Sequence, residues 1–265
     1  MNETSLLLEA VTDVARVAGS VALRHFRTRL RVETKSDGSP VTIADRAAEA
    51  AARKWIAERF PSDDVLGEEM VSVDRGASRR WIIDPIDGTK SYVRGVPLWG
   101  TLIAVVEGER VLASAAYFPA LEELLCAGTG LGCWWNGSLA RVSTVDRLDA
   151  ATVLTTDERF AAAPAREPSW RRLAPRAALS RSWGDCYGYL LVATGRAEVM
   201  VDGALAAWDA AALVPVITEA GGVFTDWNGR PTAFGGSGIA TNAALAVEVR
   251  AVLGADAPAR EGVRP

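Results

Sequence analysis

Residues 81–89, with the sequence WIIDPIDGT, constrain the fold more than any other part of the chain. The stretch begins with three β-formers and therefore predicts a short buried strand that runs into two carboxylates, Asp84 and Asp87. Pro85 and Gly88 then predict that the chain leaves the sheet and reverses sharply. Asp-Pro and Asp-Gly pairs are also ordinary turn residues, which need no ligand.

The same stretch has the composition of an ion-binding site. Sheets of α/β proteins place ligands at the carboxyl ends of their strands, and both acids stand at such an end. A helical turn that begins at Thr89 would direct the amides of Gly88 and Thr89 toward an anion. Two hard carboxylates beside an anion site indicate a divalent cation that bridges protein and phosphate. This interpretation requires more carboxylates to converge from elsewhere in the chain.

Composition excludes several classes of function. The chain has 265 residues, of which 49% are hydrophobic, so it can bury a large core as one large domain or two lobes. A net charge of −4 argues against binding to nucleic acid or to a membrane surface. No apolar run reaches membrane-spanning length, and the N-terminus lacks the basic region of a signal peptide. The chain has one histidine and three cysteines without a CxxC pair, which argues against a zinc site. An odd number of scattered cysteines favours a reducing compartment, so we expect a cytoplasmic protein.

The first half of the chain predicts two helices followed by a β-rich segment. Apolar spacing gives helices over residues 6–26 and 41–60, the first capped by Thr4 or Ser5 and the second by Thr42. We expect His25 to be a partly buried helix residue and Lys35 to be a solvated loop residue. Strands over residues 102–106, 111–117 and 121–127 then form an antiparallel meander. Helices ahead of an antiparallel sheet predict an α+β fold.

The second half predicts shorter elements. We expect strands at residues 152–155, 197–201, 223–225 and 239–241, with helices at 187–194, at 208–221 (kinked by Pro215) and up to 253. Residues 159–178 support no assignment. We expect an N-terminal α+β lobe over residues 1–145, a C-terminal α/β lobe over 146–256 and a frayed tail over 257–265.

Five acids stand at the ends of these elements: Asp45, Glu68, Asp84, Asp87 and Asp209. Singly, they have simple explanations, since acids stabilise helix N-termini and a glutamate pair after glycine usually faces solvent. In this order, from VTIAD through GEE and WIIDPIDGT to WDAAALVPVITEAGG, they resemble the inositol monophosphatase superfamily of metal-dependent phosphomonoesterases. The resemblance covers nearly the whole chain, and two separated signature blocks match.

The resemblance implies roles for individual residues. It implies that Thr89 and Asp45 orient and help to deprotonate the attacking water, and that the amides of Gly88 and Thr89 hold the phosphate. The implied metal ligands are Glu68, which also belongs to the catalytic set, Asp84, the carbonyl of Ile86, Asp87 and Asp209. It further implies a five-layered αβαβα sandwich, a homodimer and Mg²⁺, with Mn²⁺ as an alternative.

Charge supports this implication. The four side-chain ligands carry a formal charge of −4, and a phosphate ester adds about −2, so two or three Mg²⁺ would roughly neutralise the site. A water molecule that Mg²⁺ acidifies can attack the phosphate directly, and no covalent protein nucleophile is needed.

Residues 181–202 look most like histidinol-phosphate phosphatases of this family. Asp185 follows Gly184, where relatives that bind polyol phosphates carry small residues, and Asp202 matches an acidic substrate contact. Two acids suit the ammonium and imidazole of histidinol phosphate. A helix N-cap also explains Asp185. The implied substrate-binding residues are Asp87, Gly88, Thr89, Gly184, Asp185, Asp202 and Asp209. An inositol-1-phosphate or broad sugar-phosphate phosphatase, and a regulatory binding protein on the same fold, are the alternatives.

Overall fold

The fold is seen in a computed structural model that describes residues 2–35 and 38–255. The tail expected over residues 257–265 lies outside these residues, and the division into lobes at residue 145 stays a prediction. None of the helices in the described part of the chain combines the length and apolarity needed to cross a membrane. Cys126, Cys133 and Cys186 are all free.

Helix α1, Glu3–His25, packs one apolar stripe against a large sheet. It begins earlier than expected, because the side chain of Asn2 accepts a hydrogen bond from the Ser5 amide at 2.8 Å. Asn2 is therefore the N-cap, and the expectation of Thr4 or Ser5 was wrong. His25 is half-buried in the last turn, as predicted.

Helix α2, Ile43–Arg59, begins at the predicted cap. The Thr42 hydroxyl accepts a hydrogen bond from the Ala44 amide, and the Asp45 carboxylate accepts one from the Thr42 amide at 2.8 Å. This reciprocal capping box fixes the first turn of α2 and with it the position of Asp45.

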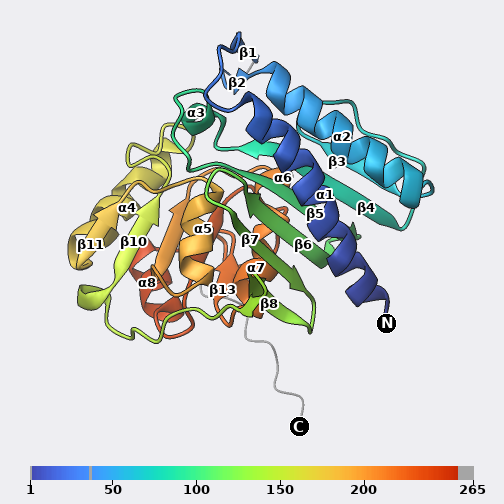
Figure 1. The fold of residues 1–265 in the computed structure, drawn as a ribbon. Helices are drawn as coiled ribbons and strands as arrows, with labels where there is room; N and C mark the ends of the chain where they lie inside the picture. The colour runs from blue at the N-terminus through green and yellow to red at the C-terminus, as the bar shows by residue number, and fades with distance from the viewer. Residues whose placement is uncertain (1, 36–37, 256–265) are drawn as a thin grey trace.

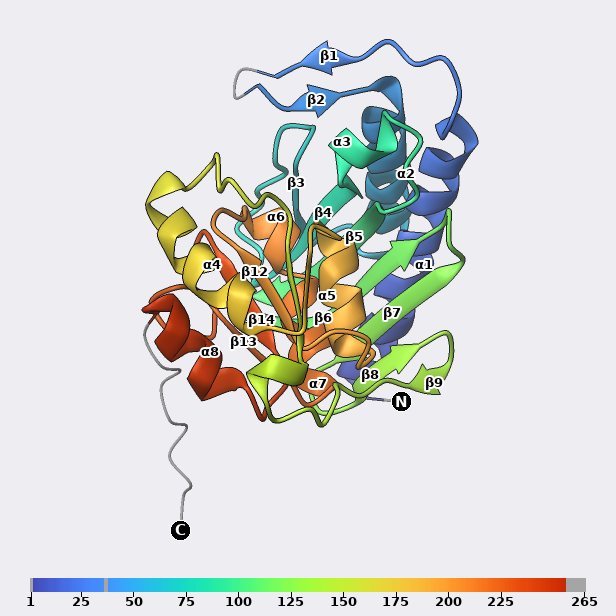
Figure 2. The same ribbon diagram turned by 90° about the vertical axis from the view of Figure 1, so that its left-hand side faces the viewer.

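The larger sheet has seven strands in sequential order. The strands are β3 (Asp64–Gly67), β4 (Arg79–Asp87), β5 (Gly100–Glu107), β6 (Arg110–Phe118), β7 (Glu123–Gly128), β8 (Gly132–Trp135) and β9 (Ser138–Leu139). The predicted hairpin joins β5 to β6. The sheet is not wholly antiparallel as expected, because β3 pairs with β4 in parallel. A separate hairpin of β1 (Glu33–Thr34) and β2 (Pro40–Val41) lies at the same end of the molecule as the short helix α3, Thr89–Tyr92 (Figure 2).

The smaller sheet has five strands in the order β11-β10-β12-β14-β13. They are β10 (Thr152–Thr155), β11 (Leu179–Arg181), β12 (Val199–Asp202), β13 (Val223–Thr225) and β14 (Gly238–Thr241). β10 pairs in parallel with β11 and β12, whereas β14 is antiparallel to β12 and β13. Of these strands, only β11 had no counterpart in the sequence analysis.

The remaining helices are short. They are α4 (Glu167–Leu173), α5 (Cys186–Ala193), α6 (Ala207–Ala210), α7 (Leu213–Glu219) and α8 (Ala246–Leu253), with single 3-10 turns at Leu148–Ala150, Pro164–Arg166 and Ala174–Arg176. α4 lies in the segment that the sequence left unassigned. The single kinked helix expected over residues 208–221 is two helices. Pro215 has no amide that could donate to the carbonyl of Ala211, and the chain turns at Ala211 and Ala212, between the two helices.

The elements stack in five layers, as the resemblance implied (Figure 1). α1 and α2 cover the outer face of the seven-stranded sheet, and α5, α6 and α7 lie between the two sheets. α4 and α8 cover the outer face of the five-stranded sheet. The fold is therefore an αβαβα sandwich.

Arg250 on α8 is fully buried and has no carboxylate partner among the described residues. Its guanidinium donates to the hydroxyls of Thr225 and Thr241 at 2.9 and 3.2 Å, and to the carbonyls of Ala246 and Ile239. Burial lowers the pKa of Arg250 to about 10. These bonds tie α8 to both β13 and β14.

Candidate active site

β4 carries the DPID acids on a continuous strand. The strand extends over Arg79–Asp87, and its register against β5 shifts within the DPID segment. The predicted departure from the sheet at Pro85 was therefore wrong, since the chain bends there as a bulge inside the strand and leaves the sheet only after Asp87. Pro85 has no amide to donate, and bulges are among the few places in a sheet that accept it. The Ile86 amide donates to Asp84 Oδ1 at 3.0 Å, and the Thr101 hydroxyl to the Pro85 carbonyl at 2.8 Å, which fixes the bulge.

Gly88 separates β4 from α3. It has a left-handed φ of +87°, and a Cβ atom there would lie only 3.2 Å from Asp185 Oδ2. Thr89 then opens α3, as predicted, and its hydroxyl donates to the Ile86 carbonyl at 3.0 Å. In this structure Thr89 thus holds the carbonyl that the family resemblance assigns to the metal.

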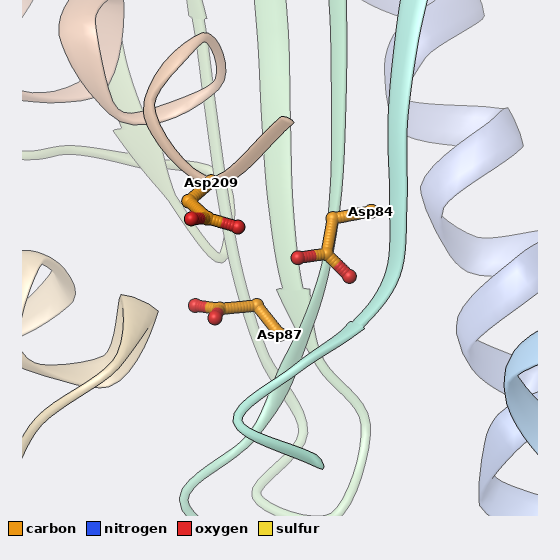
Figure 3. Close-up of side chains that lie close together, drawn as sticks. All are labelled: Asp84, Asp87 and Asp209. Carbon is orange, nitrogen blue, oxygen red and sulfur yellow. The ribbon is translucent and has the colours of Figure 1, made fainter. Parts of the chain in front are cut away.

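Asp209 reaches the two β4 acids from α6, more than a hundred residues along the chain. Its Oδ2 accepts a hydrogen bond from the Ala206 amide at 2.7 Å, which orients the carboxylate. Oxygen atoms of Asp84, Asp87 and Asp209 all lie within 4.8 Å of one another. Figure 3 shows the three side chains lying close together. The convergence that the sequence interpretation required is present.

Glu68 lies beside this group but is not part of it. Its carboxylate is close enough to raise the pKa of Asp84, yet it is paired with Lys35, whose Nζ lies 2.6 Å from Glu68 and 2.6 Å from Glu69. The expectation that Lys35 is merely solvated was wrong. Burial alone would lower the pKa of Lys35, but the two glutamates raise it above its ordinary value. A lysine therefore neutralises part of the acidic site.

Asp45 faces the site from the first turn of α2. It is almost fully buried, and its Oδ2 accepts the bonds from Thr42 that form the capping box. Its other oxygen, Oδ1, is buried without a hydrogen-bond partner in the structure. Among the described residues, no hydrogen bond joins Asp45 to Thr89. A buried carboxylate oxygen that lacks a donor is unusual, and it leaves one acceptor position of Asp45 unused by the protein.

The acids of the cluster resist ionisation. Burial raises the pKa of Asp84, and the charges of Glu68, Asp87 and Asp209 raise it further. Burial likewise raises the pKa of Asp87, with Asp185 and Asp209 adding to the effect. The pKa of Asp209 rises to about 7 through burial, opposed by the Ala206 amide. Hard oxygen donors that repel one another fit Mg²⁺, which prefers such ligands and would relieve the repulsion.

Asp87 also connects the cluster to the neighbouring helix. Its Oδ2 accepts a hydrogen bond from the Cys186 amide at 2.6 Å, so it occupies the N-terminus of α5. The side chain of Asp185, at the N-cap position itself, makes no capping bond. The alternative interpretation of Asp185 as a helix cap was therefore wrong. Its backbone instead has φ +51° and ψ −157°, close to a region that only glycine occupies freely.

The segment before α5 places Asp185 against Thr156. A Cβ atom at Gly184 would lie 2.2 Å from the Thr156 Cα, so only glycine allows this approach. The Asp185 amide donates to the Thr156 hydroxyl at 2.8 Å. Burial and the charge of Asp202 raise the pKa of Asp185 to about 6, while Lys90 opposes the shift.

Asp202 ends β12 at the floor of a cavity of about 110 Å³. The Tyr189 hydroxyl donates to its Oδ2 at 2.9 Å, and the Thr156 amide to its Oδ1 at 3.2 Å. Burial raises the pKa of Asp202 to about 6 despite these bonds. Asp87, Asp185 and Asp209 line the same cavity, so two of the expected metal ligands share one space with the expected substrate contacts Asp185 and Asp202.

A second cavity of about 200 Å³ adjoins the first. The two share Thr156, Asp202 and Ala204, and Lys90 and Phe160 line the second. The combined hollow extends well beyond the size of a phosphate group.

Sequence reasoning missed several residues of the site, namely Thr156 and Tyr189, which hold Asp202, the Cys186 amide, and Lys35 with Glu69. Each acts through a contact between segments that are far apart in sequence, and none belongs to a recognisable motif. The resemblance over residues 181–202 did point to the region of Tyr189, but nothing in it marked the tyrosine hydroxyl as a partner of Asp202.

Comparisons with known proteins settle the family. The model of the inositol monophosphatase family matches residues 3–255. The chain belongs to the inositol monophosphatase family. Among its relatives, histidinol-phosphatase of Chlorobaculum parvum is 43% identical over 250 residues, covering 93% of this chain and 96% of that protein. Histidinol-phosphatase of Mycobacterium tuberculosis is 38% identical over 231 residues, covering 85% and 89%.

Solved structures agree with the fold. The suhB extragenic suppressor protein of Bartonella henselae superposes with a TM-score of 0.87 at 26% identity, covering 97% of this chain and 100% of that one. As a member of the inositol monophosphatase family, the chain is a phosphomonoesterase, and the family is metal-dependent. The cluster of Asp84, Asp87 and Asp209 can bind such a metal.

Proposed function

We propose that this protein is a Mg²⁺-dependent phosphatase that hydrolyses L-histidinol phosphate to L-histidinol and phosphate, a step of histidine biosynthesis. One observation carries the choice of substrate: the cavity beside the acidic cluster holds two further carboxylates, Asp185 and Asp202. The histidinol-phosphatase relatives at 43% and 38% identity support the same choice.

The second pair of acids calls for a cationic leaving group. With pKa values of about 6, Asp185 and Asp202 are largely ionised at neutral pH and share their cavity with two more acids, Asp87 and Asp209. An ammonium or imidazolium group would relieve the repulsion between them through charge-assisted hydrogen bonds. An inositol phosphate offers only hydroxyls to this space and leaves the repulsion in place. The adjoining cavity of about 200 Å³ provides room for a ring.

The proposed roles divide between two groups of residues. Asp84, Asp87, Asp209 and Glu68, with the Ile86 carbonyl, would hold Mg²⁺ or Mn²⁺, two or three ions in all. When bound, the metal supplies the positive charge that acidifies water and stabilises the leaving oxygen. Thr89 and Asp45 would orient the attacking water, for which the unpaired Oδ1 of Asp45 is the available acceptor. The amides of Gly88 and Thr89 would hold the phosphate.

The experiment compares phosphate release from L-histidinol phosphate and from inositol 1-phosphate by the purified protein with Mg²⁺. We expect a kcat/KM at least ~100-fold higher for histidinol phosphate, since loss of two charge-assisted contacts costs ~3 kcal/mol or more. A preference for inositol 1-phosphate would overturn the substrate and retain the phosphatase. No Mg²⁺-dependent turnover of any phosphate ester would favour a regulatory binding protein on this fold.

The homodimer and the cytoplasmic location remain predictions. Sedimentation equilibrium of the purified protein checks the first, with the mass of two chains as the expected result.

A further inference from the structure

Glu49 is a fully buried carboxylate that neither the motif nor the proposed chemistry uses. It lies on α2, one turn after Asp45, with no exposed surface. Its Oε2 accepts a hydrogen bond from the Glu69 amide at 2.7 Å, and its Oε1 accepts one from Arg53 Nε at 2.7 Å. The Glu49 carboxylate therefore binds both the Arg53 guanidinium on the same helix and the backbone amide of Glu69, the residue after Glu68.

Arg53 also binds the backbone of Met70, the residue after Glu69. Its second nitrogen donates to the Met70 carbonyl at 3.1 Å, so the Glu49–Arg53 pair holds both the amide of Glu69 and the carbonyl after it. From the opposite side, the Glu68 amide donates to the Ile83 carbonyl on β4 at 3.2 Å. The backbone of Glu68 is therefore fixed between α2, which carries Asp45, and β4, which carries Asp84.

Gly67 makes this contact possible. A Cβ atom at this position would lie 2.1 Å from Glu49 Oε1 and 2.4 Å from its Cδ. The backbone of Gly67 is outside the left-handed region, so the glycine is required by space and not by conformation. The glycine of the GEE motif is explained by the carboxylate that packs against it.

We propose that Glu49 is a positioning residue that fixes Glu68 as a metal ligand, an inference that rests on the proposed Mg²⁺ site. A buried carboxylate costs free energy to desolvate, and an apolar side chain would fill the same space at a lower cost. What an apolar side chain cannot do is accept the Glu69 amide and orient the turn. Outer partners of this kind orient the ligands of metal sites and change metal affinity when they are removed.

The test uses the full chain and two variants, Glu49→Gln and Gly67→Ala. The first weakens the pairing of residue 49 with Arg53, and the second keeps Glu49 but pushes its carboxylate off the turn. The readouts are Mg²⁺ affinity by calorimetry, the rise in Tm that Mg²⁺ produces, and the Mg²⁺ dependence of turnover. We expect Mg²⁺ affinity to fall ~10- to 100-fold in each variant. In a Glu49→Ala background, Gly67→Ala should cause no further loss, because the two act through one contact.

Glu198→Gln is the matched control. Glu198 is also buried, with 6% of its surface exposed, and its carboxylate accepts a hydrogen bond from the Thr152 amide at 2.6 Å. It lies just before β12, at the opposite end of that strand from Asp202. The Glu198→Gln substitution should lower Tm and leave Mg²⁺ affinity unchanged.

Wild-type Mg²⁺ affinity in both Glu49→Gln and Gly67→Ala, whatever their Tm, would overturn the proposal and make Glu49 a purely structural residue. If Glu49→Gln fails to fold, Gly67→Ala decides. If the unaltered protein binds no Mg²⁺, the proposed function fails first and this inference falls with it, a result that differs from a loss confined to the variants.

Discussion

Replacing Asp185 by glycine should make the protein more stable and a poorer histidinol-phosphate phosphatase. Asp185 has φ +51° and ψ −157°, and its side chain makes no capping bond that would offset the strain. A non-glycine residue in such a conformation costs ~1–3 kcal/mol, and it persists where the surrounding structure or a function requires it. The substitution removes the strain and the carboxylate together.

The size of the effect follows from two opposing contributions. Relief of strain adds ~1–3 kcal/mol, while the greater freedom of glycine in the unfolded chain subtracts ~0.5–1 kcal/mol. The net gain is roughly 1 kcal/mol, which for a chain of this size raises Tm by ~2–4 °C. Loss of one charged contact to the substrate costs ~1.5–3 kcal/mol, so kcat/KM for histidinol phosphate should fall ~10- to 100-fold.

The assay measures urea unfolding and the kcat/KM of two substrates, histidinol phosphate and an uncharged aryl phosphate. Glu122→Gly is the matched control, since Glu122 is exposed, has φ +56° and lies away from the site. It should gain stability in the same way and keep full activity on both substrates. A less stable Asp185→Gly protein would refute the strain argument. Equal losses on the two substrates would refute the contact between Asp185 and the leaving group.

Three further predictions concern the cluster and the core. Asp84→Asn should lower Mg²⁺-dependent kcat/KM by more than ~100-fold, yet raise the Tm of the metal-free protein, because it removes a buried carboxylate that its neighbours repel; a lowered Tm would contradict this. The pKa of Asp209 is raised from 3.8 to about 7, so between these two pH values the folded metal-free protein binds more protons than the unfolded chain. Its stability should therefore fall as the pH rises from about 5 to 7.5, while Mg²⁺ affinity rises, and equal Mg²⁺-induced Tm shifts at pH 5.5 and 7.5 would disprove the linkage. Arg250→Met should lower the free energy of unfolding by roughly 3 kcal/mol in urea, because its buried acceptors lose their donor, and should leave Mg²⁺ affinity unchanged.

Local signals in the sequence predicted the parts of the site that form locally. The cap at Thr42, the acids of DPID and the helical turn at Thr89 all depend on neighbours within four residues, and all are present. The bulge at Pro85 was missed, because Asp-Pro followed by Asp-Gly has the same composition whether the chain turns out of a sheet or bends within it.

Contacts between distant segments could not be predicted from residue patterns. Asp209 was placed beside Asp84 only by the family resemblance, since nothing in the spacing relates α6 to β4. Lys35 is a further case. Its polar, glycine-containing surroundings indicate a solvated loop, and only the folded chain brings its ammonium within 2.6 Å of Glu68. The cavity at Asp202 depends on Tyr189 in the same way.

One hydrogen bond has consequences for how the enzyme can move. Because the first amide of α5 donates to an oxygen of Asp87, the aspartate that faces the cluster is also the anchor of the helix that bears Tyr189. Any shift of that carboxylate pulls on the helix, and any shift of the helix pulls on the carboxylate. The acidic cluster on β4 and the helix whose tyrosine holds Asp202 are therefore coupled through one carboxylate, so a movement of either one is transmitted to the other.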